Sequence, residues 1–91
     1  MKQTARHIIF TGRVQGVGFR FTVFNIANRY NLTGFVRNLP DSGVEMVAQG
    51  PDDDIAASIR DIKQSFGNYV TETKIEEIPY GTQYEDFKIT F

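Results

Sequence analysis

Two glycines, Gly16 and Gly18, stand between an apolar run that ends at Thr11 and an amphipathic run that begins near Phe21. Glycine adopts positive φ values at little steric cost, so the backbone can turn sharply here and direct successive N–H groups at one point. This spacing predicts a strand, a tight loop and the start of a helix. No other feature of the sequence constrains the fold as strongly.

Arg20 follows the loop directly and falls in the first turn of the predicted helix. Unpaired amides and the positive end of the helix dipole favour an anion at this position, and the planar guanidinium offers parallel donors to a phosphate. The spacing alone leaves two interpretations open. Glycines often make only a tight connection, and an arginine at a helix start is often a solvated surface group.

Hydrophobic periodicity and turn residues predict the remaining elements. Asn31 is expected to take the left-handed conformation that ends the first helix, and residues 79–83 are expected to form a loop. The helices are expected at 21–30 and between the opening residues 50–54 and Gly67, and the strands at 7–11, 33–38, 44–49, 69–78 and 87–91.

The order strand, helix, strand, strand, helix, strand predicts two βαβ units that share one sheet. The expected architecture is an α+β, ferredoxin-like βαββαβ sandwich, an antiparallel sheet with both helices on one face. Right-handed crossovers would place strands 7–11 and 44–49 side by side in the middle of the sheet. The 91 residues are expected to form a single domain, 1–91.

Charge and cysteine content exclude several classes of function. Ten Lys and Arg against eleven Asp and Glu give a formal net charge of −1, which argues against nonspecific electrostatic binding of nucleic acid. The chain has no cysteine, so it offers no disulfide framework and no thiolate nucleophile. Residues 1–6 lack the apolar segment of a signal peptide, and we expect a soluble, cytoplasmic protein without a membrane partner.

The loop from Gln15 to Arg20 contains no Ser, Thr, Cys, Asp or His that could attack a bound phosphoryl group. The only histidine, His7, lies on the first predicted strand, where we expect an exposed strand residue. Direct attack by water is therefore the simpler chemistry. Asn38, at the end of a predicted strand, offers an uncharged acceptor and donor to position that water, although it also fits a turn residue before Pro40.

The run GRVQGVGFR at 12–20 closely resembles the signature of the acylphosphatase family. The run GFVRN at 34–38 resembles that family's second signature, and the spacing of elements from 5 to 91 is similar to the whole domain. This resemblance implies the ferredoxin-like fold and the hydrolysis of small acyl phosphates to carboxylate and inorganic phosphate. It implies no metal and no organic cofactor, with inorganic phosphate as product or inhibitor.

The resemblance also implies roles for individual residues. Arg20 matches the family's phosphate-binding catalytic arginine, and Asn38 matches the asparagine that orients the hydrolytic water. The residues that match the phosphate-cradling, substrate-binding loop are Gln15, Gly16, Val17, Gly18 and Phe19, together with Arg20. The sequence departs from the usual pattern in small ways, with Phe35 where many members carry Trp and Asn31 where Gly often ends the first helix.

Three other interpretations are weaker. An RNA-binding module shares the element order, but the corresponding strand, 44–49, carries no aromatic residue. A non-catalytic acylphosphatase-like binding or regulatory domain, as in a hydrogenase maturation protein, is expected in a much longer chain. The carboxylates at 52–54 suggest a metal site, but a helix N-terminus is reason enough for their position. We expect a monomer.

Overall fold

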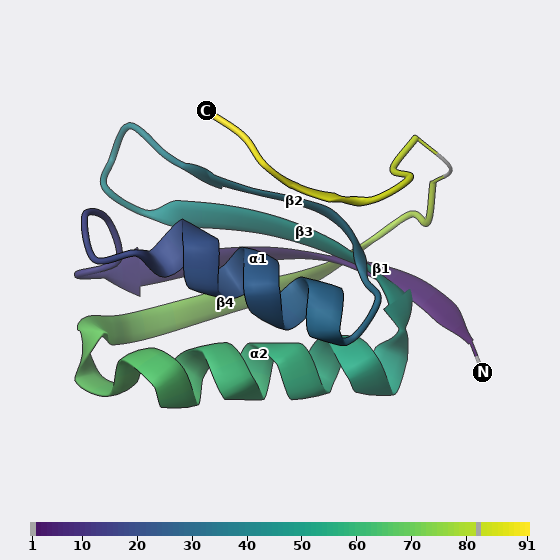
Figure 1. Cartoon of the computed structure of the whole chain (residues 1–91), viewed down its shortest axis with the longest axis horizontal. Helices are drawn as coiled ribbons and strands as arrows, with labels where there is room; N and C mark the ends of the chain where they lie inside the picture. Colours follow the sequence, from purple (N-terminus) through teal and green to yellow (C-terminus); the bar gives the residue numbers. More distant parts are fainter. Residues whose placement is uncertain (1, 82) are drawn as a thin grey trace.

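A five-stranded sheet covered on one face by two helices organises the chain (Figure 1). The computed structural model describes residues 2–81 and 83–91, so Thr82 of the expected loop at 79–83 lies outside the described residues. The elements are β1 Gln3–Gly12, α1 Phe19–Arg29, β2 Thr33–Asn38, β3 Val44–Pro51, α2 Asp52–Phe66, a short 3₁₀ helix η1 Gly67–Tyr69, β4 Val70–Ile78 and β5 Phe87–Ile89.

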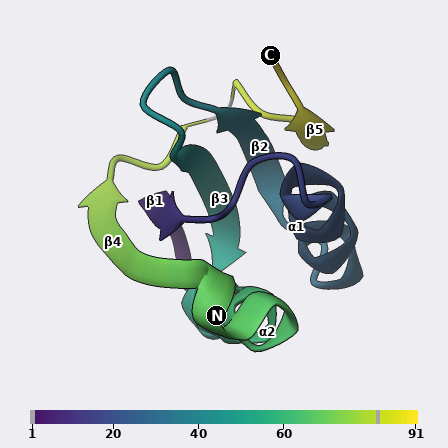
Figure 2. The same cartoon turned by 90° about the vertical axis from the view of Figure 1, so that its left-hand side faces the viewer.

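The strand order is β4-β1-β3-β2-β5, which confirms the ferredoxin-like arrangement and the central pair of β1 and β3. The expectation of a wholly antiparallel sheet is wrong, because β5 pairs in parallel with β2 (Figure 2). The chain reverses direction after β4 and crosses to the opposite edge of the sheet. Arriving there, it runs in the same direction as β2, so the sheet is mixed.

The first strand is longer than the predicted range 7–11, because β1 is paired on both sides. Gln3 lies opposite Pro51 of β3, and Ala5 lies opposite Ile78 of β4. Backbone pairing therefore extends the strand through polar residues that break the apolar alternation. The last strand is shorter than the predicted range 87–91 and ends at Ile89.

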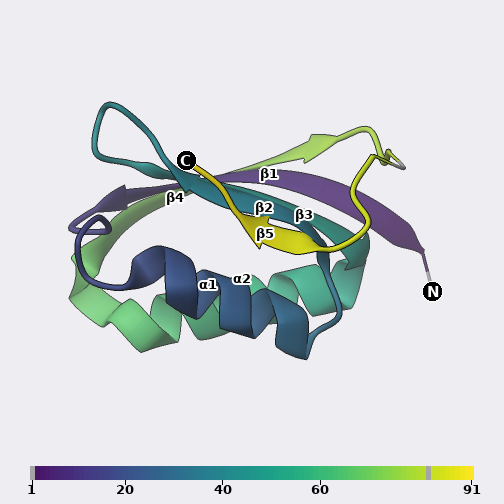
Figure 3. The same cartoon turned by 45° about the horizontal axis from the view of Figure 1, so that its top comes forward.

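The core lies between the sheet and the helices, which Figure 3 shows on the same side of the strands. Helix α1 begins two residues earlier than expected, at Phe19. The Phe19 ring is buried, with its centroid 5.1 Å from that of Phe10 on β1 and 4.5 Å from that of Phe66 at the end of α2. This cluster fixes the first turn of α1 against both layers of the fold.

The connection between β4 and β5 is attached to the outer face of the sheet, away from the helices. Gln49 on β3 is only 2% exposed, and its side chain exchanges two hydrogen bonds with the backbone of Gly81. The amide Nε2 donates to the Gly81 carbonyl at 3.0 Å, and Oε1 accepts from the Gly81 N–H at 2.9 Å. These bonds direct the chain toward the edge where β5 joins β2.

None of the helices in the described part of the chain is both long and apolar enough to cross a membrane.

Asn31 ends α1 in the predicted left-handed conformation, with a φ of 58°. The N–H of Leu32 donates to the carbonyl of Ala27 at 3.0 Å, and the N–H of Asn31 donates to that of Asn28 at 3.1 Å. This pair of bonds is a Schellman motif with asparagine where glycine is usual. Leu32 is buried beside it, so the motif also fixes the entry into β2.

We expect Asn31→Ala to lower the free energy of unfolding by about 1 kcal/mol, because alanine tolerates positive φ poorly, and Asn31→Gly to change it little. Urea unfolding of the two variants measures the difference. Asn28→Ala, at an exposed helical position, is the matched control and should be neutral or slightly stabilising. Equal losses for alanine at both positions would contradict a conformational role for Asn31.

Candidate active site

The loop between β1 and α1 presents its backbone at one end of the sheet. Gly16 and Gly18 have φ values of 79° and 78°, and both are exposed. A Cβ at either position would meet no atom within 4 Å, so conformation and not space requires glycine there. Gly18 immediately precedes α1, whose first amides have no partners within the helix. This backbone conformation is suited to a concave set of donors.

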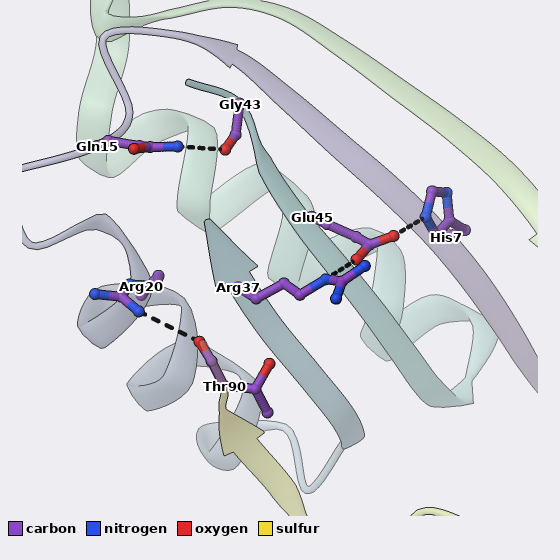
Figure 4. A network of polar contacts seen from close by, with 7 residues as sticks. All are labelled: His7, Gln15, Arg20, Arg37, Gly43, Glu45 and Thr90. Carbon is purple, nitrogen blue, oxygen red and sulfur yellow. Dashed lines mark hydrogen bonds and ion pairs between the residues drawn. The ribbon is translucent and has the colours of Figure 1, made fainter. Parts of the chain in front are cut away.

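Arg20 is half-buried in the first turn of α1, as the sequence predicts. Its Nη1 donates to the backbone carbonyl of Thr90 at 3.3 Å (Figure 4), and its guanidinium carbon lies 4.9 Å from the centre of the Phe91 ring. The bond and the stacking contact restrict the guanidinium. Other N–H groups of the fork stay available to an anion, since arginine carries five donors.

Asn38 ends β2 and faces the same side of the sheet as the buried Val36, two residues before it. That side is the one covered by α1. The Oδ1 atom of Asn38 is buried and has no hydrogen-bond partner among the described residues. A buried acceptor without a partner is costly unless a water or a ligand satisfies it.

One cavity of about 300 Å³ brings these groups together. It is lined by both loop glycines, Arg20 and Asn38. The remaining lining residues are apolar, namely Val14, Phe19, Phe21, Ile89 and Phe91. A second cavity of about 270 Å³, beside Phe35 and Tyr84, contains neither Arg20 nor Asn38.

Gln15 plays a part that the sequence does not indicate. Its Nε2 donates to two backbone carbonyls of the β2–β3 turn, those of Leu39 and Gly43, each at 2.8 Å. Figure 4 shows the side chain extended toward Gly43. Both amide hydrogens are used, so the side chain joins the loop to the hairpin that carries Asn38. Gln15 and Val17 are not among the described residues that line the cavity.

No motif in the sequence indicates that Arg20 contacts Thr90 and Phe91. Thr90 reaches Arg20, and Phe91 reaches the cavity, because β5 adds in parallel to β2, where the Thr90 N–H donates to the Val36 carbonyl at 2.9 Å. The alternating apolar residues at 87–91 predict a strand, but they carry no information about its neighbour.

His7 belongs to a separate polar cluster on the outer face of the sheet. Its Nε2 lies 2.7 Å from Oε2 of Glu45, whose Oε1 accepts from Nε of Arg37 at 2.5 Å (Figure 4). Partial burial raises the pKa of Glu45, but the hydrogen bonds from His7 and Arg37 outweigh it and leave that pKa below its ordinary value of 4.5. This cluster is structural, and His7 is a strand residue as expected, although it is partly buried and not exposed.

The first of the carboxylates at the start of α2, Asp52, has structural partners. Nη2 of Arg6 lies 2.8 Å from Oδ1 of Asp52, and the Thr4 hydroxyl donates to the same oxygen at 3.3 Å. Within residues 2–81 and 83–91, no group of three or more His, Cys, Asp or Glu side chains is arranged to hold a metal ion.

The chemistry of the cavity follows from its lining. The amides and Arg20 can offer positive charge and donors to a tetrahedral oxyanion, and Oδ1 of Asn38 can offer an acceptor to a water molecule. None of the described lining residues is a Ser, Thr, Cys, His, Asp or Glu, so the lining offers no side-chain nucleophile. The arrangement suits phosphoryl transfer to water, which depends on positioning and charge stabilisation.

Comparison with known proteins gives a consistent result. The acylphosphatase family model matches residues 6–89. An acylphosphatase of Caldanaerobacter subterraneus subsp. tengcongensis is 40% identical over 91 residues, which span 98% of this chain and 99% of the relative. The crystal structure of acylphosphatase from Bacillus subtilis is similar with a TM-score of 0.90 and 33% identity, covering 99% and 100% of the two chains. T. kodakarensis HypF matches with a TM-score of 0.83 and 37% identity, over 97% of this chain but 12% of HypF.

The Glu45 cluster should contribute to acid stability. Because the pKa of Glu45 is lowered on folding, its ionised form stabilises the fold above the ordinary pKa, and this contribution is lost as pH falls through the lower folded value. We therefore expect Glu45→Gln to be less stable than wild type at about pH 5, with the difference shrinking toward about pH 3. Urea midpoints measure it, and Glu72→Gln, at an exposed position of β4, is the control.

Proposed function

Because the chain belongs to the acylphosphatase family and is an acyl phosphate hydrolase, we propose that it cleaves the carboxyl-phosphate bond by direct attack of water. The phosphoryl group is held by Arg20 and the loop amides, and the water is held by Asn38. The products are a carboxylate and inorganic phosphate. The observation that carries this assignment is that Arg20 and the unpartnered Oδ1 of Asn38 line one cavity.

Arg20 is proposed to bind the equatorial oxygens of the phosphoryl group, where negative charge develops during transfer. The backbone N–H groups of the cradle, from Gln15 to Phe19, add fixed donors. Thr90 and Phe91 hold the guanidinium before substrate arrives, so little reorganisation is needed. Because this charge comes from the chain itself, we propose that the reaction needs neither a metal nor an organic cofactor.

Asn38 is proposed to accept a hydrogen bond from the attacking water and to orient it in line with the scissile bond. A neutral amide is suitable here, because a carboxylate at the same position would repel the bound phosphoryl group. A carboxylate leaving group has a low pKa and departs without a proton, so the reaction does not require a general acid. Positioning and electrostatic stabilisation are then sufficient.

We also propose that the chain acts as a single-domain monomer in the cytoplasm, with a small-molecule acyl phosphate as its only required partner. The cysteine-free sequence suits a reducing compartment. The net charge of −1 supports the absence of a nucleic-acid partner, since phosphate affinity is confined to one local site. Inorganic phosphate, which presents the same oxygens as the phosphoryl group, is expected to act as a competitive inhibitor.

Hydrolysis of benzoyl phosphate in the presence of a chelator tests the two assignments together. We expect Arg20→Ala to abolish both turnover and inhibition by phosphate. Asn38→Ala should lower kcat by roughly a hundredfold or more while phosphate still binds. Arg20→Lys should restore little, because lysine lacks the bidentate fork.

Arg13→Ala is the matched control for the arginine variants. Arg13 is exposed in the same loop, and its guanidinium stacks on Tyr69, 5.3 Å from the ring centre and outside the cavity lining. Its variant should keep wild-type turnover. A folded wild-type protein that does not hydrolyse benzoyl phosphate would overturn the enzymatic assignment and favour a binding or regulatory domain.

Gln15 is proposed as a positioning residue, and the isosteric variant Gln15→Glu tests this role. At neutral pH a carboxylate would face the carbonyls of Leu39 and Gly43 and could not donate to them. We expect kcat to fall by about tenfold or more, and the ratio of variant to wild-type kcat to rise as pH is lowered toward 5, because the protonated acid donates one bond again. Gln15→Ala should show a pH-independent loss. Parallel pH profiles for both variants would contradict a role through these hydrogen bonds.

A further inference from the structure

We propose that the cavity of about 270 Å³ beside Phe35 and Tyr84 binds a small organic cation, an ammonium or guanidinium group attached to a hydrocarbon body. The bound cation holds β5 against β2 and so stabilises the contact between Thr90 and Arg20. The described residues that line this cavity are all different from those that line the cavity of Arg20. The site itself is independent of the proposed function, whereas its effect on phosphate binding rests on the role proposed for Arg20.

Two aromatic rings form the apolar part of this cavity. Phe35 alternates with the buried Val36 and therefore points to the outer face of the sheet, where its ring centre lies 6.0 Å from that of Tyr84. Both rings are half-buried, and neither belongs to the core between the sheet and the helices. The Arg37 guanidinium carbon already lies 5.9 Å from the centre of the Phe35 ring. A cation is thus a suitable neighbour for this pair, because aromatic faces attract positive charge.

The charged side chains of the lining favour a ligand of the same sign. Glu85 and Asp86 contribute two carboxylates, and Lys88 contributes one ammonium group. Within the described part of the chain, none of the three takes part in an ion pair. An organic cation can pair with the carboxylates while its hydrocarbon body lies on the rings, whereas an anion would meet an excess of like charge. The volume is near the lower limit for small-molecule sites, so the ligand is small.

The cavity bridges two segments that only a short pairing holds together. Phe35 belongs to β2, whereas Tyr84 belongs to the β4–β5 connection and Thr90 follows β5. The two strands lie side by side in Figure 3 and pair over three residues of each. Such a short pairing at the edge of a sheet opens more readily than the pairing of central strands. A ligand that contacts both segments binds the paired state and therefore stabilises it.

Thr90 connects this cavity to Arg20. It lines the cavity, and its backbone carbonyl accepts the bond from Nη1 of Arg20 at 3.3 Å (Figure 4). Its N–H donates to the Val36 carbonyl at 2.9 Å, so the place of the Thr90 carbonyl depends on the pairing of β5 with β2. A cation that holds β5 therefore keeps Arg20 in the position proposed for phosphate binding. By linkage, bound phosphate raises the affinity for the cation by the same factor.

Chemical-shift mapping by two-dimensional NMR, with benzylammonium and phenylguanidinium as probes, tests the site directly. We expect the backbone amides of Phe35 and Lys88 to shift with both probes, and those of Gly16 and Gly18 to shift much less. Benzyl alcohol carries the same ring without charge and should bind about three- to fivefold more weakly than benzylammonium. Phe35→Leu and Tyr84→Leu should each weaken benzylammonium binding by about two- to fivefold, because leucine is apolar but offers no aromatic face.

Charge variants separate electrostatic attraction from fit. Glu85→Gln combined with Asp86→Asn should remove most of the preference for benzylammonium over benzyl alcohol. Lys88→Gln should tighten benzylammonium binding by about twofold, because it removes a like charge. Glu72→Gln changes an exposed carboxylate on β4, at the opposite edge of the sheet, and is the matched control. An unchanged preference in the double variant, or tighter binding of phenylacetate than of benzylammonium at Phe35 and Lys88, would overturn the assignment of a cation.

Hydrogen exchange of the Thr90 amide tests the coupling without turnover. Saturating benzylammonium should slow this exchange, and it should lower the inhibition constant of phosphate by about twofold or more. If the probe binds at Phe35 but neither quantity changes, the coupling is wrong and the site stands. If exchange slows while wild type neither binds phosphate nor hydrolyses benzoyl phosphate, the proposed function fails and the site stands. If neither cation shifts the amides of Phe35 and Lys88, the site itself is wrong.

Discussion

Two hydrogen bonds from the amide of Gln15 fix the distance between the two halves of the site. They run from the glycine loop to the carbonyls of the β2–β3 turn, which lies at the same end of the sheet in Figure 1. The cradle belongs to the β1–α1 connection and Asn38 belongs to the hairpin, so no short stretch of chain holds them together. In the proposed reaction a phosphoryl group and its attacking water must be aligned within a fraction of an ångström, and these bonds would hold the two elements that align them.

An aromatic cluster in the core holds the start of α1 in addition to the Gln15 hydrogen bonds. Phe19 is the first residue of α1, and its contacts with Phe10 and Phe66 fix the position of the helix N-terminus relative to the sheet. Arg20 comes next in the sequence, about 100° further around the helix, so the buried ring determines where the guanidinium can reach. Hydrogen bonds therefore join the loop to the hairpin, aromatic packing holds the start of the helix, and the cavity lies where the three elements meet.

Much of this could be predicted because it is encoded locally. The glycine loop, the position of Arg20 in the first helical turn and the left-handed Asn31 follow from backbone preferences of single residues, and the helices follow from periodicity. The parallel β5, the early half of β1 and the contacts of Thr90 and Phe91 could not be predicted, because they depend on pairing between distant segments. Gln15 lies in the recognisable motif, yet its side-chain partners are 24 and 28 residues away, and the motif does not name them.

The bond between Arg20 and Thr90 joins residues 70 positions apart, and this has a consequence for the order in which the site is completed. During synthesis from the N-terminus, the glycine loop and the β2–β3 hairpin leave the ribosome well before β5 exists. The cradle and Asn38 can therefore be in place on a nascent chain whose arginine is still free to move. In the proposed mechanism, competence for chemistry would therefore arrive with β5, and a ribosome-bound chain that lacks this strand would bind phosphate loosely and turn over little.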